Sequence, residues 1–438
     1  MDDIRTVKLG LLGCGTVGGA LARLLDDRRD MIVARTGVRL EITRIAVRDL
    51  DKPRDVAVAD HVFTVDTMGV VEDPDVDVVV ELIGGVDVAR ELVAAALALG
   101  KPVITGNKAL LAAHGAELYA AADAAGVDLL FEAAVGGGIP VVRPLRESLQ
   151  GEPILRVMGI VNGTTNYILT RMTEDDAEYA DALAEAQRLG YAEADPTADV
   201  AGHDAAAKLA ILSSIAFGSR VVLDDVHLEG IEGITVGDVD YARREGYVIK
   251  LLAVGERAGA EGPDGAVRRV AVRVHPALVP ATHPLASVRD SFNAVFVEGS
   301  SVGEVMFYGR GAGGGPTASA VMGDLVDAAG NLRRGTSAAL PPLTRASIVP
   351  IEELISQYYV AIEVVDRHGV LAAVAGAFAE NDVSIRSVVQ EGTEDQASLV
   401  FVTHAAREAH VQATLAALRD LDAVRRVGSV LRLIGGEA

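Results

Sequence analysis

A short stretch near the start of the chain reads Val7-Lys8-Leu9-Gly10-Leu11-Leu12-Gly13-Cys14-Gly15-Thr16-Val17-Gly18. Its first half is an apolar run that predicts a buried strand, and the residues from Val17 to Leu25 predict a helix. Glycines between a strand and a helix allow a tight turn, at which backbone N–H groups attract a pyrophosphate. The pattern therefore predicts a dinucleotide-binding turn, although a plain glycine-rich turn would share it. The predicted cofactor contacts are Gly13, Gly15, Thr16, Val17 and Gly18, and Cys14 is interpreted as a small packing residue.

Strand and helix patterns alternate after this turn. Short β-rich runs at 41–47, 76–82, 102–105 and 127–132 alternate with helical patterns at 89–99 and 110–125. Repeated βαβ units predict an α/β domain of the Rossmann type, with a doubly wound parallel sheet covered on both faces. We expect residues 1–139 to form this domain and a segment at about 305–330 to rejoin it.

The pattern changes from about Pro140. Helical stretches (141–149, 177–189, 203–217) mix with strand-like runs (155–161, 248–254, 267–274, 291–298), which predicts an α+β substrate-binding and dimerisation domain over 140–330. Residues 331–350 contain Pro341-Pro342 and several Ser and Thr, so they are interpreted as a linker. The remainder, 351–438, has the βαββαβ order of a ferredoxin-like module.

The composition excludes several classes of protein. Of the 438 residues, 50% are hydrophobic and 23% are charged, which excludes a disordered or fibrous chain. The net charge of −22 argues against nucleic acid or an anionic membrane surface as a partner. No uncharged apolar run reaches the roughly 18 residues that a membrane helix needs. A single cysteine, and a first segment (Met1-Asp2-Asp3-Ile4-Arg5) unlike a signal peptide, favour the cytoplasm.

The end of the second predicted strand bears on the choice of cofactor. An acidic residue there would bind the ribose hydroxyls of NAD, whereas an arginine would suit the 2′-phosphate of NADP. Arg48 favours NADP, but Asp49 beside it keeps NAD possible, and Arg48 is nearly as easily read as an ordinary surface charge.

Two lysines stand out because lysine is scarce. Only six of the 40 basic residues are lysines. Lys108 follows the fourth strand, at the edge where ligands of doubly wound sheets bind, although it could simply be exposed beside a helix cap. Lys208 lies four residues after Asp204 among apolar neighbours, a setting that favours release of its proton to a substrate. An ordinary salt bridge between the two residues explains the spacing equally well.

At this point several motifs together resemble one family. The matching stretches are Gly13 to Gly18, Thr105-Gly106-Asn107-Lys108, Glu132 to Pro140, Gly159-Ile160-Val161-Asn162-Gly163-Thr164-Thr165-Asn166-Tyr167, 189–208 and 308–324. They resemble homoserine dehydrogenase, and the tail from Asp366 to Ile385 is similar to an ACT domain, an amino-acid-sensing module.

The resemblance implies reversible hydride transfer between a nicotinamide cofactor and the pair L-homoserine and L-aspartate 4-semialdehyde, in threonine, methionine and isoleucine biosynthesis. It implies Lys208 as the acid/base, Lys108 as a group near nicotinamide and substrate, and Asp199 as support for the lysine. Glu193 and Asp204 would hold the substrate ammonium, and Gly190 and Gly313 would line the cofactor.

The resemblance also implies a cation, an effector and further copies of the chain. A monovalent cation such as sodium would bind at Glu132, Val135, Gly137 and Ile139. Threonine is the expected feedback effector, with Gly369 and Asn381 on the ligand side, although the module could serve pairing alone. ACT modules usually pair, which implies a homodimer or homotetramer.

The residues bear on three other functions. Aspartate-semialdehyde dehydrogenase needs a catalytic cysteine on a substrate-domain loop, and the single cysteine lies in the glycine turn. A fused aspartokinase would need a long segment before Val7, so we expect a monofunctional chain. A non-catalytic regulator that binds NADP and an amino acid would not need Lys108, Glu193, Asp204 and Lys208 together.

Overall fold

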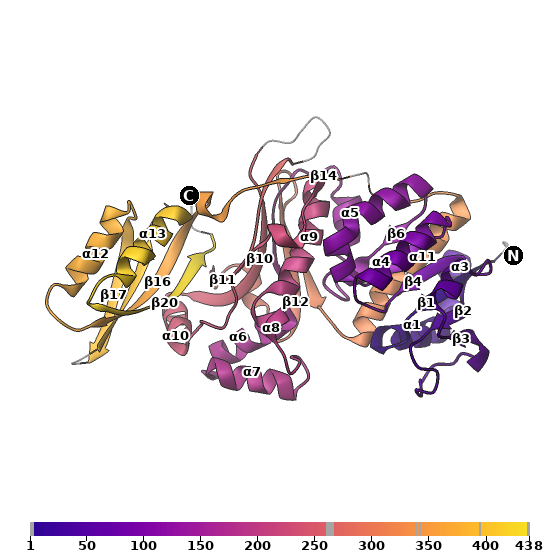
Figure 1. The fold of residues 1–438 in the computed structure, drawn as a ribbon, viewed down its shortest axis with the longest axis horizontal. Helices are drawn as coiled ribbons and strands as arrows, with labels where there is room; N and C mark the ends of the chain where they lie inside the picture. The colour runs from indigo at the N-terminus through magenta and orange to yellow at the C-terminus, as the bar shows by residue number, and fades with distance from the viewer. Residues whose placement is uncertain (1–3, 260–266, 339, 341–342, 394–395, 436–438) are drawn as a thin grey trace.

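The structure is a computed structural model that describes residues 4–259, 267–338, 340, 343–393 and 396–435. Residues 1–3, which contributed to the expectation about a leader, and Pro341-Pro342, which contributed to the linker prediction, lie outside the described residues. Three lobes follow one another along the molecule, and the C-terminal ferredoxin-like module and the glycine-turn domain stand at opposite ends (Figure 1).

The first lobe is built on a six-stranded parallel sheet. Its strand order is β3-β2-β1-β4-β5-β6, the Rossmann order that the alternating patterns predicted. The strands are β1 (Arg5–Leu12), β2 (Val38–Ala46), β3 (Phe63–Thr64), β4 (Val78–Glu81), β5 (Val103–Thr105) and β6 (Leu129–Leu130). The helices of this part are α1 (Thr16–Asp27), α2 (Arg29–Thr36), α3 (Thr67–Glu72), α4 (Asp87–Ala98) and α5 (Lys108–Ala125).

A distant helix completes this lobe. Helix α11 (Gly314–Arg334) packs against α1 through buried Ala318, Val321 and Leu325 (Figure 1). The rejoining segment therefore begins later than the expected residue 305, because β13 (Gly303–Arg310) pairs with the second sheet. It also extends past 330, so the first residues of the expected linker are helical.

The second lobe is a largely antiparallel sheet with helices on one face. Its strands are β7 (Ile154–Ile160), β9 (His227–Leu228), β10 (Tyr247–Arg257), β11 (Arg269–Pro280), β12 (Phe292–Gly299) and β13. Its helices are α6 (Gly163–Asp175), α7 (Tyr179–Arg188), α8 (Thr197–Val200), α9 (His203–Phe217) and α10 (Val236–Arg244). The helix expected at 141–149 is instead a π-helical turn at Pro144–Ser148.

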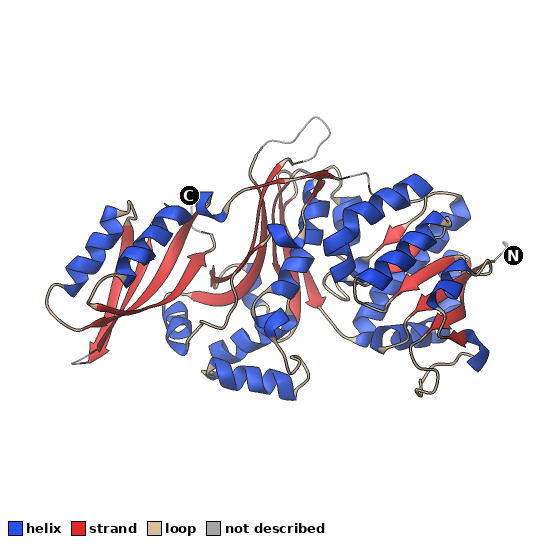
Figure 2. Cartoon of the chain, viewed as in Figure 1, coloured by secondary structure: helices blue, strands red, loops and turns tan. Residues whose placement is uncertain are grey.

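The third lobe has the predicted βαββαβ order. It consists of β16 (Ile355–Val365), α12 (Val370–Glu380), β17 (Ile385–Thr393), β18 (Gln396–Thr403), β19 (Ala406–Arg407), α13 (Glu408–Arg419) and β20 (Val424–Leu433) (Figure 2). Its sheet is not separate, because β20 pairs with β11 and joins both sheets into one of twelve strands. The expected linker is also anchored: β14 (Thr344–Arg345) pairs with β8 (Ser219–Arg220), and β15 (Ser347–Ile348) pairs with β11.

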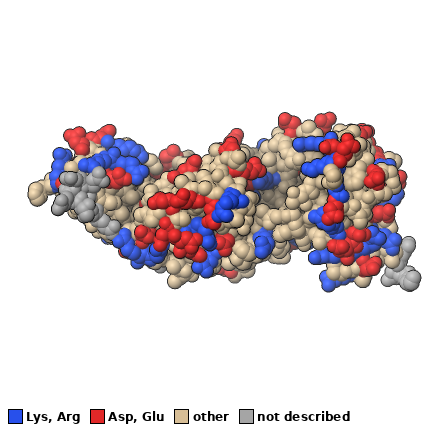
Figure 3. All heavy atoms as spheres, turned by 90° about the horizontal axis from the view of Figure 1, so that it is seen from below, with Lys and Arg blue, Asp and Glu red and all other residues tan. Residues whose placement is uncertain are grey.

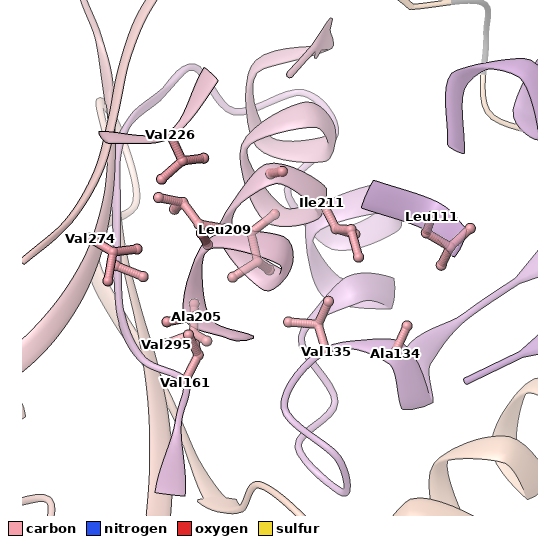
Figure 4. Close-up of a cluster of buried hydrophobic side chains, with 14 of the residues drawn as sticks. Leu111, Ala134, Val135, Val161, Ala205, Leu209, Ile211, Val226, Val274 and Val295 are labelled. Atoms are coloured by element: carbon pink, nitrogen blue, oxygen red, sulfur yellow. The ribbon is translucent and has the colours of Figure 1, made fainter. Parts of the chain in front are cut away.

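Helix α9 lies at the centre of the molecule between the second sheet and the first lobe. Leu209 and Ala205 lie on the side of sheet residues such as Val274 and Val295, whereas Ile211 faces the first lobe (Figure 4). A helix that is apolar on every side must be buried on every side. The Asp204 and Lys208 side chains near its start are therefore largely buried.

The described helices include none long and apolar enough to cross a membrane. On the face drawn in Figure 3, acidic and basic side chains are interspersed over all three lobes.

Candidate active site

A cleft in the first lobe fits a dinucleotide. It is lined by the glycine turn, the end of β2 and the loop after β4. A Cβ atom at Gly13 would lie 2.8 Å from the carbonyl oxygen of Leu82, so the turn can pack this tightly only with glycine. A Cβ at Gly15 would meet nothing within 4 Å, and α1 has neither a side-chain cap nor an acid in its first turn. Its free N–H groups therefore face open space that a pyrophosphate can occupy.

The start of α11 meets the same turn. Gly313 precedes the helix with φ +115°, and a Cβ at Gly314 would lie 3.0 Å from the Thr16 methyl group. The N-termini of α1 and α11 thus converge, which brings Gly313 beside the predicted cofactor contacts.

Three cations line the cleft after the end of β2. Arg48, Lys52 and Arg54 line it together with Asp49. Arg54 donates to the Asp49 carbonyl oxygen at 2.6 Å and lies over the ring of Phe63 at 5.5 Å.

Glu81 is a buried acid that the sequence analysis missed. At the end of β4, its carboxylate accepts hydrogen bonds from the N–H groups of Ile83 and Gly84 and from the Thr105 hydroxyl at 2.5 Å. These bonds hold the loop that forms one wall of the cleft. An acid directly after the apolar run Val78-Val79-Val80 was the available signal.

Lys108, Asp204 and Lys208 form one chain of ion pairs where the first two lobes meet. Lys108 begins α5, and its ammonium contacts one oxygen of Asp204, on α9. Lys208 donates to the other oxygen at 2.7 Å and to the Val161 carbonyl oxygen at 2.6 Å. Burial raises the pKa of Asp204, but the charges of Lys208 and Lys108 outweigh it and hold that pKa well below its usual range. Asp204 therefore stays ionised.

The contacts of Lys208 differ from the apolar surrounding that was expected. Its chain neighbours Ala207 and Leu209 are apolar, but adjacent residues on a helix do not face the same way. The side chain, 11% exposed, faces a carboxylate and a carbonyl. Asp204 and Lys208, four residues apart, thus form a buried salt bridge.

Asn162 is a second residue that the analysis missed. Its side-chain N–H₂ donates to Asp199 at 2.6 Å and to Asp204 at 2.9 Å. Its oxygen accepts from the N–H of Thr165 at 2.9 Å and so caps α6. The cap fixes the orientation of the amide, and the free end must face the two carboxylates. An Asn between a predicted strand and a helical pattern was the signal.

Glu193 and Gly190 stand apart from these contacts. The Glu193 side chain is exposed and, within the described residues, makes none of the hydrogen bonds of the Asp204 cluster. Thr164 ties the loop to α6 by donating to the Tyr191 carbonyl oxygen at 2.6 Å. Gly190 has φ +77° and is not among the residues that line the cleft.

The predicted cation segment lies at the crossing between the first two lobes. The Glu132 carboxylate is occupied by the N–H groups of Val141, Val142 and Arg143. The ligands that the predicted set offers are therefore mainly the backbone carbonyls of Glu132, Val135, Gly137 and Ile139, and such oxygens suit a hard cation. Among the described residues, no group of three or more His, Cys, Asp or Glu is placed to hold a metal.

The two predicted effector residues lie at opposite ends of α12. Gly369 precedes the helix and Asn381 follows it, where its amide donates to the Ala377 carbonyl oxygen at 2.8 Å. A helix of 11 residues lies between them, so they are about 18 Å apart along its axis. One chain alone does not bring them together.

Comparison with known proteins identifies the family. The model of homoserine dehydrogenase matches residues 140–326, and that of the homoserine dehydrogenase NAD-binding domain matches 13–132. The chain belongs to the homoserine dehydrogenase family. It is an oxidoreductase that acts on a CH–OH group and has an NAD-binding domain, and the ACT domain model matches 358–423. These matches confirm the predicted family and fold class.

Individual relatives agree along the whole chain. Homoserine dehydrogenase of Corynebacterium glutamicum is 51% identical over 429 residues, covering 98% of this chain and 95% of that protein. A crystal structure of a homoserine dehydrogenase from Thiobacillus denitrificans superposes with a TM-score of 0.90 at 42% identity, covering 98% of both chains. The structure of a hyperthermophilic archaeal homoserine dehydrogenase in complex with NADPH superposes with a TM-score of 0.60 at 28% identity, covering 74% of this chain and 97% of that one.

Proposed function

We propose that the protein interconverts L-homoserine and L-aspartate 4-semialdehyde with NADP, using Lys208 as the acid/base. The observation that carries this proposal is the position of Lys208, buried between Asp204 and the Val161 carbonyl at the junction of the first two lobes. A lysine held there can reach a substrate that lies between the dinucleotide cleft and α9.

Lys208 has one free donor for the reacting oxygen. An ammonium group has three N–H donors, and Asp204 and Val161 occupy two of them. In aldehyde reduction the third N–H donates its proton to the oxygen as the alcohol forms, and in the reverse direction the neutral amine takes the hydroxyl proton.

Asp204 is suited to bind the substrate ammonium. Lys108 now contacts one of its oxygens, and the Lys108 side chain is 46% exposed, so it is free to move aside. The substrate ammonium takes that place, with Glu193 as the second carboxylate on the loop before α8. Asp199, bonded to Asn162, supports the charge balance at Lys208.

The nicotinamide supplies or accepts the hydride when it is bound in the cleft. Gly13, Gly15, Thr16, Val17, Gly18, Gly190 and Gly313 are proposed to hold the dinucleotide, and Lys108 to contact its reactive end. The cations Arg48, Lys52 and Arg54 favour NADP over NAD. The archaeal relative bound to NADPH supports this choice.

Three further assignments complete the proposal. A sodium ion binds the backbone oxygens of Glu132, Val135, Gly137 and Ile139. Threonine inhibits by binding the ACT module, where Gly369 of one copy and Asn381 of another come together in a homodimer or homotetramer. The separation of these residues in one chain supports a shared site.

The test is absorbance of reduced nicotinamide after mixing the purified protein with L-homoserine and NADP. We expect rapid, homoserine-dependent reduction, slower with NAD and inhibited by threonine. L-Homoserine O-methyl ether, which has no hydroxyl proton, is the matched control and should give no reduction. Absence of reduction with both cofactors, in sodium and potassium salts alike, would overturn the proposed reaction.

A further inference from the structure

One buried arginine joins the third lobe, which is the ACT module, to the second lobe, which we call the substrate lobe. Arg432, on β20, is 5% exposed and donates to Glu229 of the substrate lobe at 2.8 Å and to Glu408 of α13 at 2.7 Å. Tyr358 donates to Glu408 at 2.7 Å and places its ring 5.8 Å from the guanidinium. Burial raises the pKa of Glu229, but hydrogen bonds from His227 and Arg432 bring that pKa well below its usual range. Buried ion pairs add little net stability, so this one calls for another role.

Glu229 belongs to a segment, residues 227–238, that we call the bridge. Its first part runs along β11, where the Glu229 N–H donates to the Val274 carbonyl oxygen at 2.8 Å. Two residues later the Ile231 N–H donates to the Val200 carbonyl oxygen, the last residue of α8, at 2.9 Å. A Cβ at Gly230 would lie 2.5 Å from that same oxygen. The bridge and α8 therefore cannot shift independently.

The ACT module holds the other end of the bridge as well. Asp238, near the start of α10, accepts hydrogen bonds from Tyr359 at 2.8 Å and from Ser429 at 2.7 Å. The Gly233 carbonyl oxygen lies 3.0 Å from the Ser429 hydroxyl and shares its single proton with Asp238. The bridge is thus fastened to β16 and β20 at three places. In Figure 1, α10 lies beside the junction of β11 and β20.

The far side of the bridge leads to the active-site carboxylates. Helix α8 carries Asp199, and the chain turns at Gly202, with φ +88°, into α9 and Asp204. Asn162 bonds both carboxylates, so they form one unit. A displacement of Val200 would move Asp199 relative to Asn162, and would shift the start of α9, with Asp204 and Lys208, relative to the cofactor cleft.

We propose that the ACT module is a structural part of the active site: Arg432 is a positioning residue that holds Asp199 and Asp204 in place through Glu229 and the bridge. The inference rests on the proposed function, because it assigns the same carboxylates to the substrate. It goes beyond sensing, since it makes the module necessary for efficient turnover without any effector.

The chain contains a matched pair for comparison. Arg426, on the same strand as Arg432, pairs with Glu363 at 2.6 Å, but both side chains are more than half exposed and neither contacts the bridge. Exposed pairs of this kind contribute little. Glu229→Gln therefore removes the carboxylate charge from the pair that contacts the bridge. Glu363→Gln removes the same charge from a pair that does not contact it.

The experiment compares both variants in the full chain with saturating NADP. For Glu229→Gln we expect kcat/KM for homoserine to fall between about tenfold and a hundredfold, because small misplacements of binding groups are costly. The Kd for NADP should stay within about twofold, since the dinucleotide cleft does not contact the bridge. Glu363→Gln should stay within about twofold of wild type in both quantities.

Hydrogen exchange gives a readout that does not need turnover. The amides of Ile231 and of residues 199–202 should exchange faster in Glu229→Gln than in Glu363→Gln, while those of β1 and β4 stay unchanged. If wild type shows no homoserine oxidation, the proposed function fails. Hydrogen exchange alone then tests whether Glu229 and the bridge hold residues 199–202 in place.

A milder variant tests the bridge if Glu229→Gln does not fold. Tyr359→Phe with Ser429→Ala removes the two hydroxyl groups of the ACT module that donate to Asp238, leaves the local donor Thr235 in place, and should lower kcat/KM by about threefold to tenfold. The inference is overturned if either folded variant matches Glu363→Gln in kcat/KM and in exchange at 199–202.

Discussion

At the scale of residues, the contact within one helix of the candidate site could be predicted, and the contacts with residues from elsewhere in the chain could not. The spacing of Asp204 and Lys208 placed them on one face of a helix, and the structure shows the salt bridge. Asn162 and the Val161 carbonyl come from a strand end more than 40 residues earlier, and the two contacts exist only in the folded chain. Local pattern gives neighbours on an element, but tertiary packing decides what a buried side chain faces.

Asn162 offers a direct test of that unpredicted contact. Asn162→Ala leaves the carboxylates of Asp199 and Asp204 without their shared donor, so they repel each other. Hydrogen bonds to charged groups contribute about 1.5–3 kcal/mol, so we expect kcat/KM for homoserine to fall roughly tenfold to a hundredfold. Steady-state kinetics measures this change, and NADP affinity is the internal control. An unchanged kcat/KM would show that Asn162 serves only to cap α6.

Arg48 tests the cofactor assignment. Arg48→Ala removes the cation expected at the 2′-phosphate, so the KM for NADP should rise by about tenfold or more while the KM for NAD changes little. The ratio of kcat/KM for the two cofactors is the measurement. A parallel loss with NADP and NAD would mean that Arg48 supports the fold of the cleft rather than the phosphate.

At the scale of elements, strands and helices with a clear period were predicted well, and irregular ones were not. The helix patterns at 110–125 and 203–217 correspond to α5 and α9. The stretch at 141–149 contains a π-helical turn, in which the Leu149 N–H donates to the Pro144 carbonyl oxygen five residues earlier, and the Glu132 carboxylate binds the N–H groups of Val141 and Val142 from outside the segment. Such a contact leaves no trace in the local period of the sequence.

Strand β10 contains a buried lysine whose effect on stability can be measured. Lys250 donates to Asn166 at 3.0 Å and to the Val288 carbonyl oxygen at 2.5 Å, and burial lowers its pKa to about 8. Between about pH 8 and 10.5 the folded chain loses this proton first, while the unfolded chain keeps it, so its contribution to stability rises with pH.

Lys250→Met removes this dependence. From about pH 8 to 10.5 the titration of Lys250 should raise the free energy of unfolding of wild type by about 3 kcal/mol. The variant should lack this rise. Urea unfolding at several pH values measures it, with the exposed Lys52→Met as control. Parallel curves for wild type and Lys250→Met would rule out the titration of Lys250 as the cause.

At the scale of the whole molecule, the three lobes could be predicted but the joints between them could not. The patterns gave a Rossmann lobe, a substrate lobe and a ferredoxin-like module, and the family models match the same three regions. The pairing of β11 with β20 joins residues about 155 positions apart, as Ala277 and Arg432 illustrate. Prolines and hydroxyl residues at 331–350 predict a break in secondary structure between the second and third lobes. They do not indicate whether the two lobes then pack against each other.

The proposed effector site can be tested on the intact molecule. Asn381→Ala should abolish threonine inhibition while turnover without threonine stays within about twofold, because α12 lies in the ACT module and Asn381 makes no contact with the bridge. Initial rates over a threonine series measure this, with the neighbouring Glu380→Ala as control. Full inhibition in Asn381→Ala would place the effector elsewhere.

The central claim is that Lys208 moves the proton, and Lys208→Arg tests it most directly. Arginine keeps the positive charge beside Asp204 but cannot release its proton in a protein. We predict that turnover of homoserine falls by about a hundredfold to ten-thousandfold, while the Kd for NADPH by fluorescence stays within about twofold. A folded Lys208→Arg enzyme that keeps turnover within about tenfold of wild type would contradict the account.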